Sequence, residues 1–184
     1  MELYLMRHGV TVWNERRRTQ GRIHNRLSKA GIEAVSVVAF KTQNIKFDYI
    51  FTSPLLRAVQ TANLVKKYHN AKIIKDERLT DIDQGWFTGK YFDSLTEEEK
   101  EGKRNKEAKY NMETTEHFYL RIKEFFNYIL AQIDSWINIL GSQFGIFGFV
   151  TYVWYLCIPN EITGLIILFV MMLVVIAFIR HVKG

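Results

Sequence analysis

The stretch Glu2-Leu3-Tyr4-Leu5-Met6-Arg7-His8-Gly9 decides how the rest of the chain is interpreted. Its first five residues are mostly bulky and apolar, which is typical of a short buried strand. The polar residues that follow place His8 immediately after the carboxyl end of that strand. In open α/β sheets, ligands bind beside the carboxyl ends of the strands. The stretch therefore predicts a ligand-binding histidine at the edge of a sheet.

Further strands and helices are expected to alternate after this opening. Residues 47–52 and 71–74 have the composition of short strands. Helices are expected over residues 28–40, where Ser28 is a favourable cap, and over residues 53–69, with Pro54 in the first turn. The other expected segments are a loop at 16–26, a loop at 80–92, a charged helix or flexible segment at 95–109 and a helix at 115–132. This alternation predicts an α/β fold with helices on both faces of the sheet.

Charged residues are distributed unevenly along the 184 residues. The chain has 25 lysines and arginines and 19 aspartates and glutamates, yet only Glu161, Arg180 and Lys183 lie in residues 137–184. This composition excludes a disordered chain and one that is polar throughout. We therefore expect a charged domain over residues 1–136 and an apolar helical tail over residues 137–184.

The tail contains two apolar runs, residues 136–158 and 162–179, separated by Pro159-Asn160-Glu161. Roughly 20 apolar residues span a bilayer, so the tail is a candidate two-helix transmembrane hairpin that attaches the protein to a membrane through residues 137–179. Basic residues flank both runs, which predicts that both termini are cytoplasmic. The alternative is that the tail is a buried part of the core.

The basic residues and the single cysteine limit the partners and the compartment. Seven lysines and arginines but only one acidic residue lie between Arg7 and Lys29, which indicates an anionic partner such as phosphate, nucleic acid or acidic lipid. Cys157 has no second cysteine to pair with, which is consistent with a reducing compartment. The N-terminus lacks the long apolar core of a secretory signal, so we expect a cytoplasmic domain.

Three ordered motifs carry a resemblance to a known family. The first is LMRHGVTVWN at residues 5–14, followed by RTQG at 18–21, LS at 27–28 and Gly31. The second is SPLLRAVQTA at residues 53–62, and the third is LTDIDQGWFTG at residues 79–89. Together they resemble the histidine phosphatase (phosphoglycerate mutase-like) superfamily over residues 2–95. With the alternating strands and helices, the resemblance implies a three-layer sandwich with a mostly parallel sheet.

The resemblance also implies a role for each candidate site residue. His8 is expected to be the nucleophile that forms a phosphohistidine, while Arg7 and Arg57 clamp the phosphoryl oxygens, which suit the planar guanidinium group. Asp81 stands where the family usually has a glutamate as the proton donor, and its side chain is shorter by one methylene. The groups expected to add neutral hydrogen-bond donors are Asn14, Gln20 and the backbone near Gly21.

Each of these residues also has a purely structural interpretation. His8 could belong to the strand end alone, Arg57 to a helix surface and Asp81 to a turn cap. The run Arg16-Arg17-Arg18 is interpreted as a phosphate-attracting rim, because no nucleic-acid motif accompanies it. We therefore expect no nucleic-acid partner. No metal or other cofactor is expected either, since no histidines or carboxylates have ligand spacing and the arginines supply the charge.

The second half of the chain departs from the family pattern. Family members have a second histidine in a Ser-His-Gly-Gly-like turn after a late strand, and this chain has none there. If residues 137–140 form that strand, SQFG at 142–145 falls at the turn and Gln143 replaces the histidine in the substrate-binding pocket. Glutamine can donate a hydrogen bond but carries no positive charge. Loss of one transition-state donor typically slows a reaction by about a hundred- to thousandfold.

The expected function is impaired hydrolysis of a phosphorylated small molecule through a phosphohistidine on His8. Mutase activity is less favoured, because nothing in the sequence argues for retention of a released intermediate. One alternative is a catalytically inactive pseudoenzyme that binds phosphate or acts as a membrane-attached interaction protein. Another is a frame-shifted or truncated phosphatase, in which a normal opening continues into an unrelated apolar tail.

Overall fold

The computed structural model describes residues 2–144 and 175–180, with side-chain surroundings given within residues 2–132. The strands are β1 (Glu2–Arg7), β2 (Tyr49–Thr52), β3 (Lys72–Lys75) and β4 (Val175–Arg180). The α-helices are α1 (Val12–Glu15), α2 (Lys29–Lys41), α3 (Leu56–Lys66), α4 (Glu97–Asn105) and α5 (Thr115–Phe144). Short 3₁₀ helices are η1 (Glu77–Leu79), η2 (Gly85–Phe87), η3 (Phe92–Ser94) and η4 (Ala108–Tyr110).

The described strands form one mixed sheet in the order β1-β4-β2-β3. β2 and β3 pair in parallel, with Ile50 opposite Ile73. β4 is antiparallel to both of its neighbours, and Ala177 lies opposite Leu5 of β1 and Phe51 of β2. β1, β2 and β3 therefore run in the same direction and β4 runs against them. The expected α/β class is confirmed, and the sheet differs from the expected one through its antiparallel strand.

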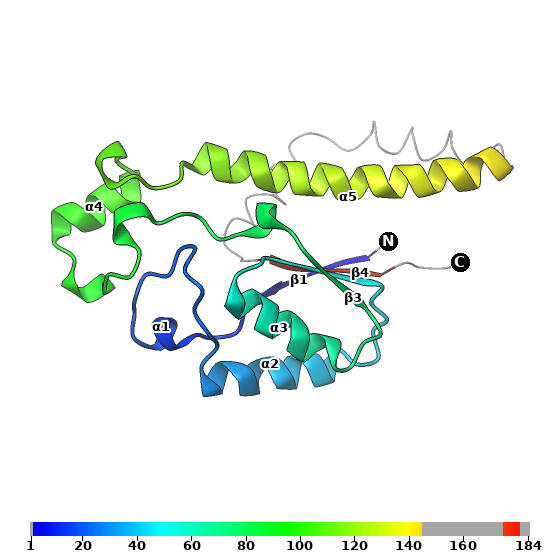
Figure 1. Ribbon diagram of the computed structural model, residues 1–184, viewed down its shortest axis with the longest axis horizontal. Coiled ribbons are helices and arrows are strands. Elements are labelled where there is room, and N and C mark those ends of the chain that lie inside the picture. The colour runs from blue at the N-terminus through cyan, green and yellow to red at the C-terminus, as the bar shows by residue number, and fades with distance from the viewer. Residues whose placement is uncertain (1, 145–174, 181–184) are drawn as a thin grey trace.

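Helices cover both faces of the sheet, as the alternation predicted: α2 and α3 lie on one face and α5 lies on the other (Figure 1). Consecutive side chains of a strand point to opposite faces. Ile50 accordingly joins the cluster with α2 and α3, and Phe51 joins the cluster with α5. The first cluster consists of Val35, Ala39, Phe47, Ile50, Ala62, Val65 and Ala71. The second consists of Phe51, Leu79, Phe118, Ile122, Phe125 and Ile129.

Local signals account for the starts of several helices. Ser28 caps α2, because its Oγ accepts a hydrogen bond of 3.1 Å from the backbone N–H of Gly31. The charged segment at 95–109 contains helix α4, whose first turn carries three glutamates that complement the helix dipole. Pro54 precedes α3 by two residues instead of lying in its first turn, since α3 begins at Leu56.

The tail departs from two expectations. α5 continues through Phe144, so residues 137–140 are helical, in agreement with a helical start of the tail, and the alternative that made them a late strand is wrong. Gln143 consequently lies in α5 and not in a turn. Residues 175–179, expected to end an apolar helix, belong instead to strand β4, which lies between β1 and β2 in the sheet. Its composition of β-branched and aromatic residues suits a strand, and pairing on both sides satisfies its backbone polar groups.

The membrane hairpin receives no support from the described part of the chain. None of the helices within residues 2–144 is both long and apolar enough to cross a bilayer. Residues 145–174, which hold most of the two expected spans, lie outside the described residues. The end of the second expected span is the strand described above, so the predicted helix is wrong for residues 175–179.

Candidate active site

His8 lies directly after β1, where the sequence predicted a ligand-binding histidine. Its ring is buried, and Nδ1 is 2.7 Å from the carbonyl oxygen of Gly9. A carbonyl can only accept, so Nδ1 carries the proton and Nε2 keeps its lone pair. Burial, together with the positive charges of Arg57 and Arg7, lowers the pKa of His8 to about 4. The imidazole is therefore neutral near pH 7 and can act as a nucleophile.

Close packing holds the backbone beside this histidine. The N–H of Gly9 donates to Thr61 Oγ1 of α3 over 3.1 Å. A Cβ atom at Gly9 would lie 2.7 Å from a methyl group of Val35 and 2.9 Å from the carbonyl oxygen of Gly31. Only glycine lets the strand end approach α2 this closely. The contacts with α2 and α3 thus fix the position of His8 in the site.

Arg57 is a fully buried arginine on the first turn of α3. Its Nη1 donates to the carbonyl oxygen of Ile23 over 2.9 Å, and its Nη2 donates to the carbonyl oxygen of Gly21 over 2.8 Å. Nη2 also lies 2.9 Å from Asp81 Oδ2. Nε is buried and has no partner among the described residues, a costly state unless another group supplies an acceptor. Arg57 is therefore an interior cation and not the surface arginine of the structural alternative.

Asp81 faces this arginine from the loop after η1. Its Oδ2 pairs with Arg57, and its Oδ1 accepts a hydrogen bond of 2.9 Å from the backbone N–H of Ile82. Burial raises the pKa of the Asp81 carboxyl above its ordinary value, although the charge of Arg57 acts in the opposite direction. A carboxyl with a raised pKa keeps its proton to a higher pH. This property suits a proton donor.

The expected neutral donors surround one hydroxyl group, that of Thr11. Thr11 Oγ1 lies 2.9 Å from Asn14 Oδ1 and 2.8 Å from Gln20 Oε1. Asn25 Nδ2 donates to the same Gln20 oxygen over 3.2 Å. These contacts use the oxygens of Asn14 and Gln20, so their amide nitrogens remain as donors. Gly21 adopts φ +53°, and its carbonyl holds Arg57.

Arg7 completes the group through charge. It is exposed, and its positive charge lowers the pKa of both His8 and Arg57. Arg7 and Arg57 thus act on His8 through their charges, and Asp81 joins this group through its ion pair with Arg57. Gln143 lies in helix α5, and the surroundings of its side chain are outside the described part of the structure. No three histidine, cysteine or carboxylate side chains in the described part of the chain are arranged to hold a metal ion.

The arginine run at residues 16–18 has an internal structural role that the sequence did not suggest. Arg17 forms an exposed ion pair with Asp93 at 3.1 Å. Arg18 stacks on Trp13, with its guanidinium carbon 4.0 Å from the ring centroid, and donates from Nε to the carbonyl oxygen of Gly89. These two arginines belong to the loop of residues 16–26, called the site loop, and therefore hold it against residues 89–93.

Two further residues beside the site were not singled out from the sequence. Glu113 and Arg121 are both buried and form a two-bond ion pair, and Arg121 also contacts the backbone of Asp81. They are eight residues apart, so no local spacing rule connects them. One signal was available: Arg121 lies between Phe118 and Ile122, two apolar positions of the predicted helix. A cation on a core-facing helix surface needs a buried partner.

The chain belongs to the Histidine phosphatase superfamily (branch 1), whose model matches residues 3–139. This membership confirms the resemblance of the three motifs. Proteins named Probable phosphoglycerate mutase GpmB from Yersinia pestis (strain Pestoides F) and Yersinia pseudotuberculosis serotype O:1b are each 35% identical to the chain over 101 residues. The match covers 55% of this chain and 47% of each relative, so the chain spans about half the length of these curated relatives.

Solved structures show the same fold. Bacillus stearothermophilus YhfR is 26% identical with a TM-score of 0.61, and the match covers 68% of this chain and 65% of that one. A phosphoglycerate mutase from Bacillus anthracis str. Sterne is 24% identical with a TM-score of 0.58, and the match covers 70% of this chain and 68% of that one. The arrangement of the described elements is therefore that of this family.

The low pKa of His8 makes protein stability depend on pH. The folded state holds the imidazole at a pKa of about 4, whereas the ordinary value is 6.5. Between these values the unfolded chain binds a proton that the folded chain does not, so the free energy of unfolding falls as the pH is lowered through this range. Urea unfolding across the range should show a shallower pH dependence for His8→Asn than for wild type. Equal dependence in the two proteins would contradict the burial argument.

Proposed function

We propose that this protein hydrolyses phosphomonoesters through a phosphohistidine formed on His8. The observation that carries the proposal is a neutral imidazole, with Nε2 unprotonated, grouped with a buried arginine and a half-buried carboxyl at the end of β1. Phosphoryl transfer needs a nucleophile, cations around the transferring group and an acid for the leaving oxygen. His8, Arg57 and Asp81 have these three properties.

The first chemical step transfers the phosphoryl group to the histidine. Nε2 of His8 attacks phosphorus, the bond from phosphorus to the ester oxygen breaks, and the Asp81 carboxyl gives its proton to that oxygen. In the second step a water molecule attacks the phosphohistidine, the P–N bond breaks, and the Asp81 carboxylate takes a proton from the water. Inorganic phosphate leaves and His8 is neutral again. The positive charges of Arg7 and Arg57 stabilise the phosphoryl oxygens in both steps.

Turnover is expected to be slower than in family members that have the second histidine. The five histidines of the chain are His8, His24, His69, His117 and His181, and none lies in a Ser-His-Gly-Gly-like turn. Each missing transition-state donor costs about a hundred- to thousandfold in rate. The Yersinia relatives and the Bacillus anthracis structure are named phosphoglycerate mutases, so mutase activity is the alternative reaction. We favour hydrolysis, since no feature of the described residues argues for retention of the phosphorylated intermediate.

The proposal is tested with p-nitrophenyl phosphate and the full chain. We expect release of nitrophenolate and inorganic phosphate in equal amounts. Rapid denaturation in base should trap a phosphorylated protein that is stable in base and labile in acid, as expected for phosphohistidine. A folded chain that releases no phosphate would overturn the proposal.

The role of Asp81 is separable from that of the nucleophile. Asp81→Asn removes the transferable proton and leaves a side chain of the same size. We expect kcat/KM for an alkyl phosphate, whose leaving oxygen needs protonation, to fall by about 10²–10⁴-fold. This quantity reports the first step, transfer of the phosphoryl group to His8, and is independent of the second step, in which Asp81 acts as a base. The value of kcat/KM for p-nitrophenyl phosphate should change much less, because nitrophenolate leaves without a proton. Equal losses of kcat/KM on the two substrates would exclude Asp81 as the acid.

A second candidate is a phosphate-binding protein without turnover. The missing second histidine favours it, since the buried arginine and His8 are sufficient for anion binding. In that case inorganic phosphate would bind to the folded chain, the affinity would fall in Arg57 variants, and no phosphorylated protein would be trapped.

A further inference from the structure

Arg121 of α5 makes an unusual set of contacts behind the Asp81 loop. Its Nη1 donates to the carbonyl oxygens of Arg78 and Thr80, each over 2.7 Å. Its Nη2 donates to the carbonyl oxygen of Asp81 over 3.1 Å. The residue is buried, with 9% of its surface exposed. One guanidinium group therefore holds three backbone carbonyls of a single short segment.

Glu113 binds the same guanidinium group and the same loop. Its Oε1 lies 2.8 Å from Arg121 Nε, and its Oε2 lies 2.9 Å from Arg121 Nη2. Oε2 also accepts a hydrogen bond of 3.2 Å from the backbone N–H of Asp83. Burial raises the pKa of Glu113, but hydrogen bonds from Arg121 and His117 outweigh it and lower the pKa to about 2. Glu113 is thus a carboxylate at neutral pH.

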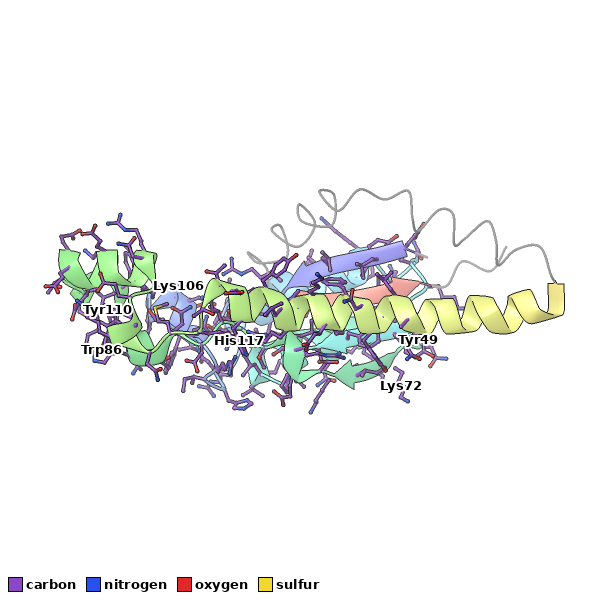
Figure 2. All side chains as sticks on the ribbon, turned by 90° about the horizontal axis from the view of Figure 1, so that it is seen from above. Tyr49, Lys72, Trp86, Lys106, Tyr110 and His117 are labelled. Carbon is purple, nitrogen blue, oxygen red and sulfur yellow. The ribbon has the colours of Figure 1, made fainter. Side chains whose placement is uncertain are left out.

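Other polar groups around this pair keep it hydrogen-bonded. His117 Nδ1 lies 2.7 Å from Glu113 Oε1, and Arg22 Nη2 lies 3.1 Å from the same oxygen. Figure 2 shows His117 at the start of α5, between the sheet and the end of the molecule that carries Trp86 and Tyr110. Buried ion pairs without such partners are a poor source of stability. This pair is well partnered, and its contacts converge on one loop.

The backbone is held on both sides of Asp81 as a result. Arg121 binds the carbonyls of Thr80 and Asp81, and Glu113 binds the N–H two residues further on, at Asp83. The Asp81 side chain has one torsion fewer than a glutamate, so its carboxyl can adjust less when the backbone moves. A displacement of about 1 Å at a reacting group can cost about a hundredfold in rate. The position of this backbone consequently decides whether the carboxyl reaches the leaving oxygen.

We propose that Arg121 and Glu113 are positioning residues that hold the Asp81 backbone so that its carboxyl can protonate the leaving group. The inference rests on the proposed function, because it concerns the acid of that reaction. The inference goes beyond the proposed function because it assigns a role to two residues that are not among the reacting groups. A pair that only stabilised the fold would change kcat/KM for all substrates alike. A positioning pair changes kcat/KM, which reports the first step, mainly for substrates whose leaving oxygen needs the acid.

The experiment compares an alkyl phosphate with p-nitrophenyl phosphate in the full chain. The variants are Glu113→Gln, which weakens the pair at constant size, and Arg121→Lys, which keeps the charge but loses the planar fork. The control is Arg78→Met, since that side chain pairs with Asp76 and does not contact Asp81. The rates compared are values of kcat/KM, which report the transfer to His8 and exclude the later hydrolysis of the phosphohistidine. We expect kcat/KM for the alkyl phosphate to fall by about 10- to 100-fold in Glu113→Gln and Arg121→Lys. The value for the aryl phosphate should change by less than about threefold, and both values should be retained in the control.

The outcomes separate this inference from the proposed function. If wild type hydrolyses neither phosphate, the proposed function fails and the positioning role fails with it. If wild type is active and the folded Glu113→Gln protein has the wild-type ratio of alkyl to aryl rates, the positioning role alone is overturned. Equal losses on both substrates would overturn it too, because they indicate a general structural effect. Should Arg121→Lys fail to fold, the ratio in Glu113→Gln still decides.

Discussion

Replacing His8 with alanine should abolish phosphate release, with a fall in kcat of about 10⁴-fold or more. The substitution removes the one protein atom that forms a bond to phosphorus in the proposed mechanism. Because the ring is buried and neutral, its loss removes no charge from the interior. The expected measurement is hydrolysis of p-nitrophenyl phosphate by wild type and His8→Ala, with the trapped phosphoprotein measured in parallel. Neither product should be detected in the variant.

His69→Ala is a matched control for this prediction. His69 is also buried, and burial also lowers its pKa, but it packs against Phe47 at a ring-centroid distance of 4.5 Å in the core with α2 and α3. Its replacement should reduce stability and leave the rate per folded molecule near that of wild type. Wild-type turnover in His8→Ala would exclude His8 as the nucleophile, whatever the result for His69→Ala.

The sequence was most informative where local chemistry determines structure. The short apolar stretch before Arg7 and His8 predicted a strand with these two residues at its carboxyl end. The structure places Arg7 at the end of β1 and His8 directly after it. Ser28 determines the start of α2 through one hydrogen bond to the next turn. The family resemblance implied a phosphate-clamping role for Arg57 but not its complete burial. Periodicity did not predict this burial either, since an arginine in a helix is usually solvated.

The rest of the fold depends on contacts that no local pattern contains. An apolar run such as Val175–Arg180 is compatible with a buried strand and with a helix, and the choice is made by the edges that β1 and β2 offer. These edges are formed by residues more than 120 positions away. The pairing of Arg121 with the Asp81 loop spans 40 residues and is equally invisible to spacing rules. Tertiary pairing therefore accounts for the failures in the tail and for the missed residues.

Arg57 should be the residue whose loss damages both binding and stability. Its guanidinium group holds two carbonyls of the site loop and the Asp81 carboxylate, with 0% of its side chain exposed. Arg57→Met leaves these acceptors without a donor. We expect a loss of about 2–4 kcal/mol in the free energy of unfolding, below the upper range for buried pairs because the Asp81 side chain is 26% exposed. Urea denaturation at neutral pH measures it.

The kinetic effect of Arg57→Met is expected to be larger than its effect on stability. In the proposed mechanism Arg57 stabilises the transferring phosphoryl oxygens, so its removal should lower kcat/KM by about 10²–10³-fold. Arg57→Lys keeps the charge and loses the planar fork, so it should recover part of the stability and less of the activity. A Lys variant with wild-type kcat/KM would contradict a role for the fork in phosphate binding.

The stability loss in Arg57→Met should also depend on pH, and the protonation of Asp81 determines whether the loss grows or shrinks as the pH rises. Arg57 favours the charged carboxylate, so its removal raises the pKa of Asp81 further above the ordinary value of 3.8. Below that raised pKa the folded variant binds a proton that neutralises the unpaired carboxylate, and above it the unpaired charge remains. The loss should therefore be larger at pH 7 than near pH 4. In an Asp81→Asn background the pH dependence of the loss should disappear, because no carboxylate is left unpaired.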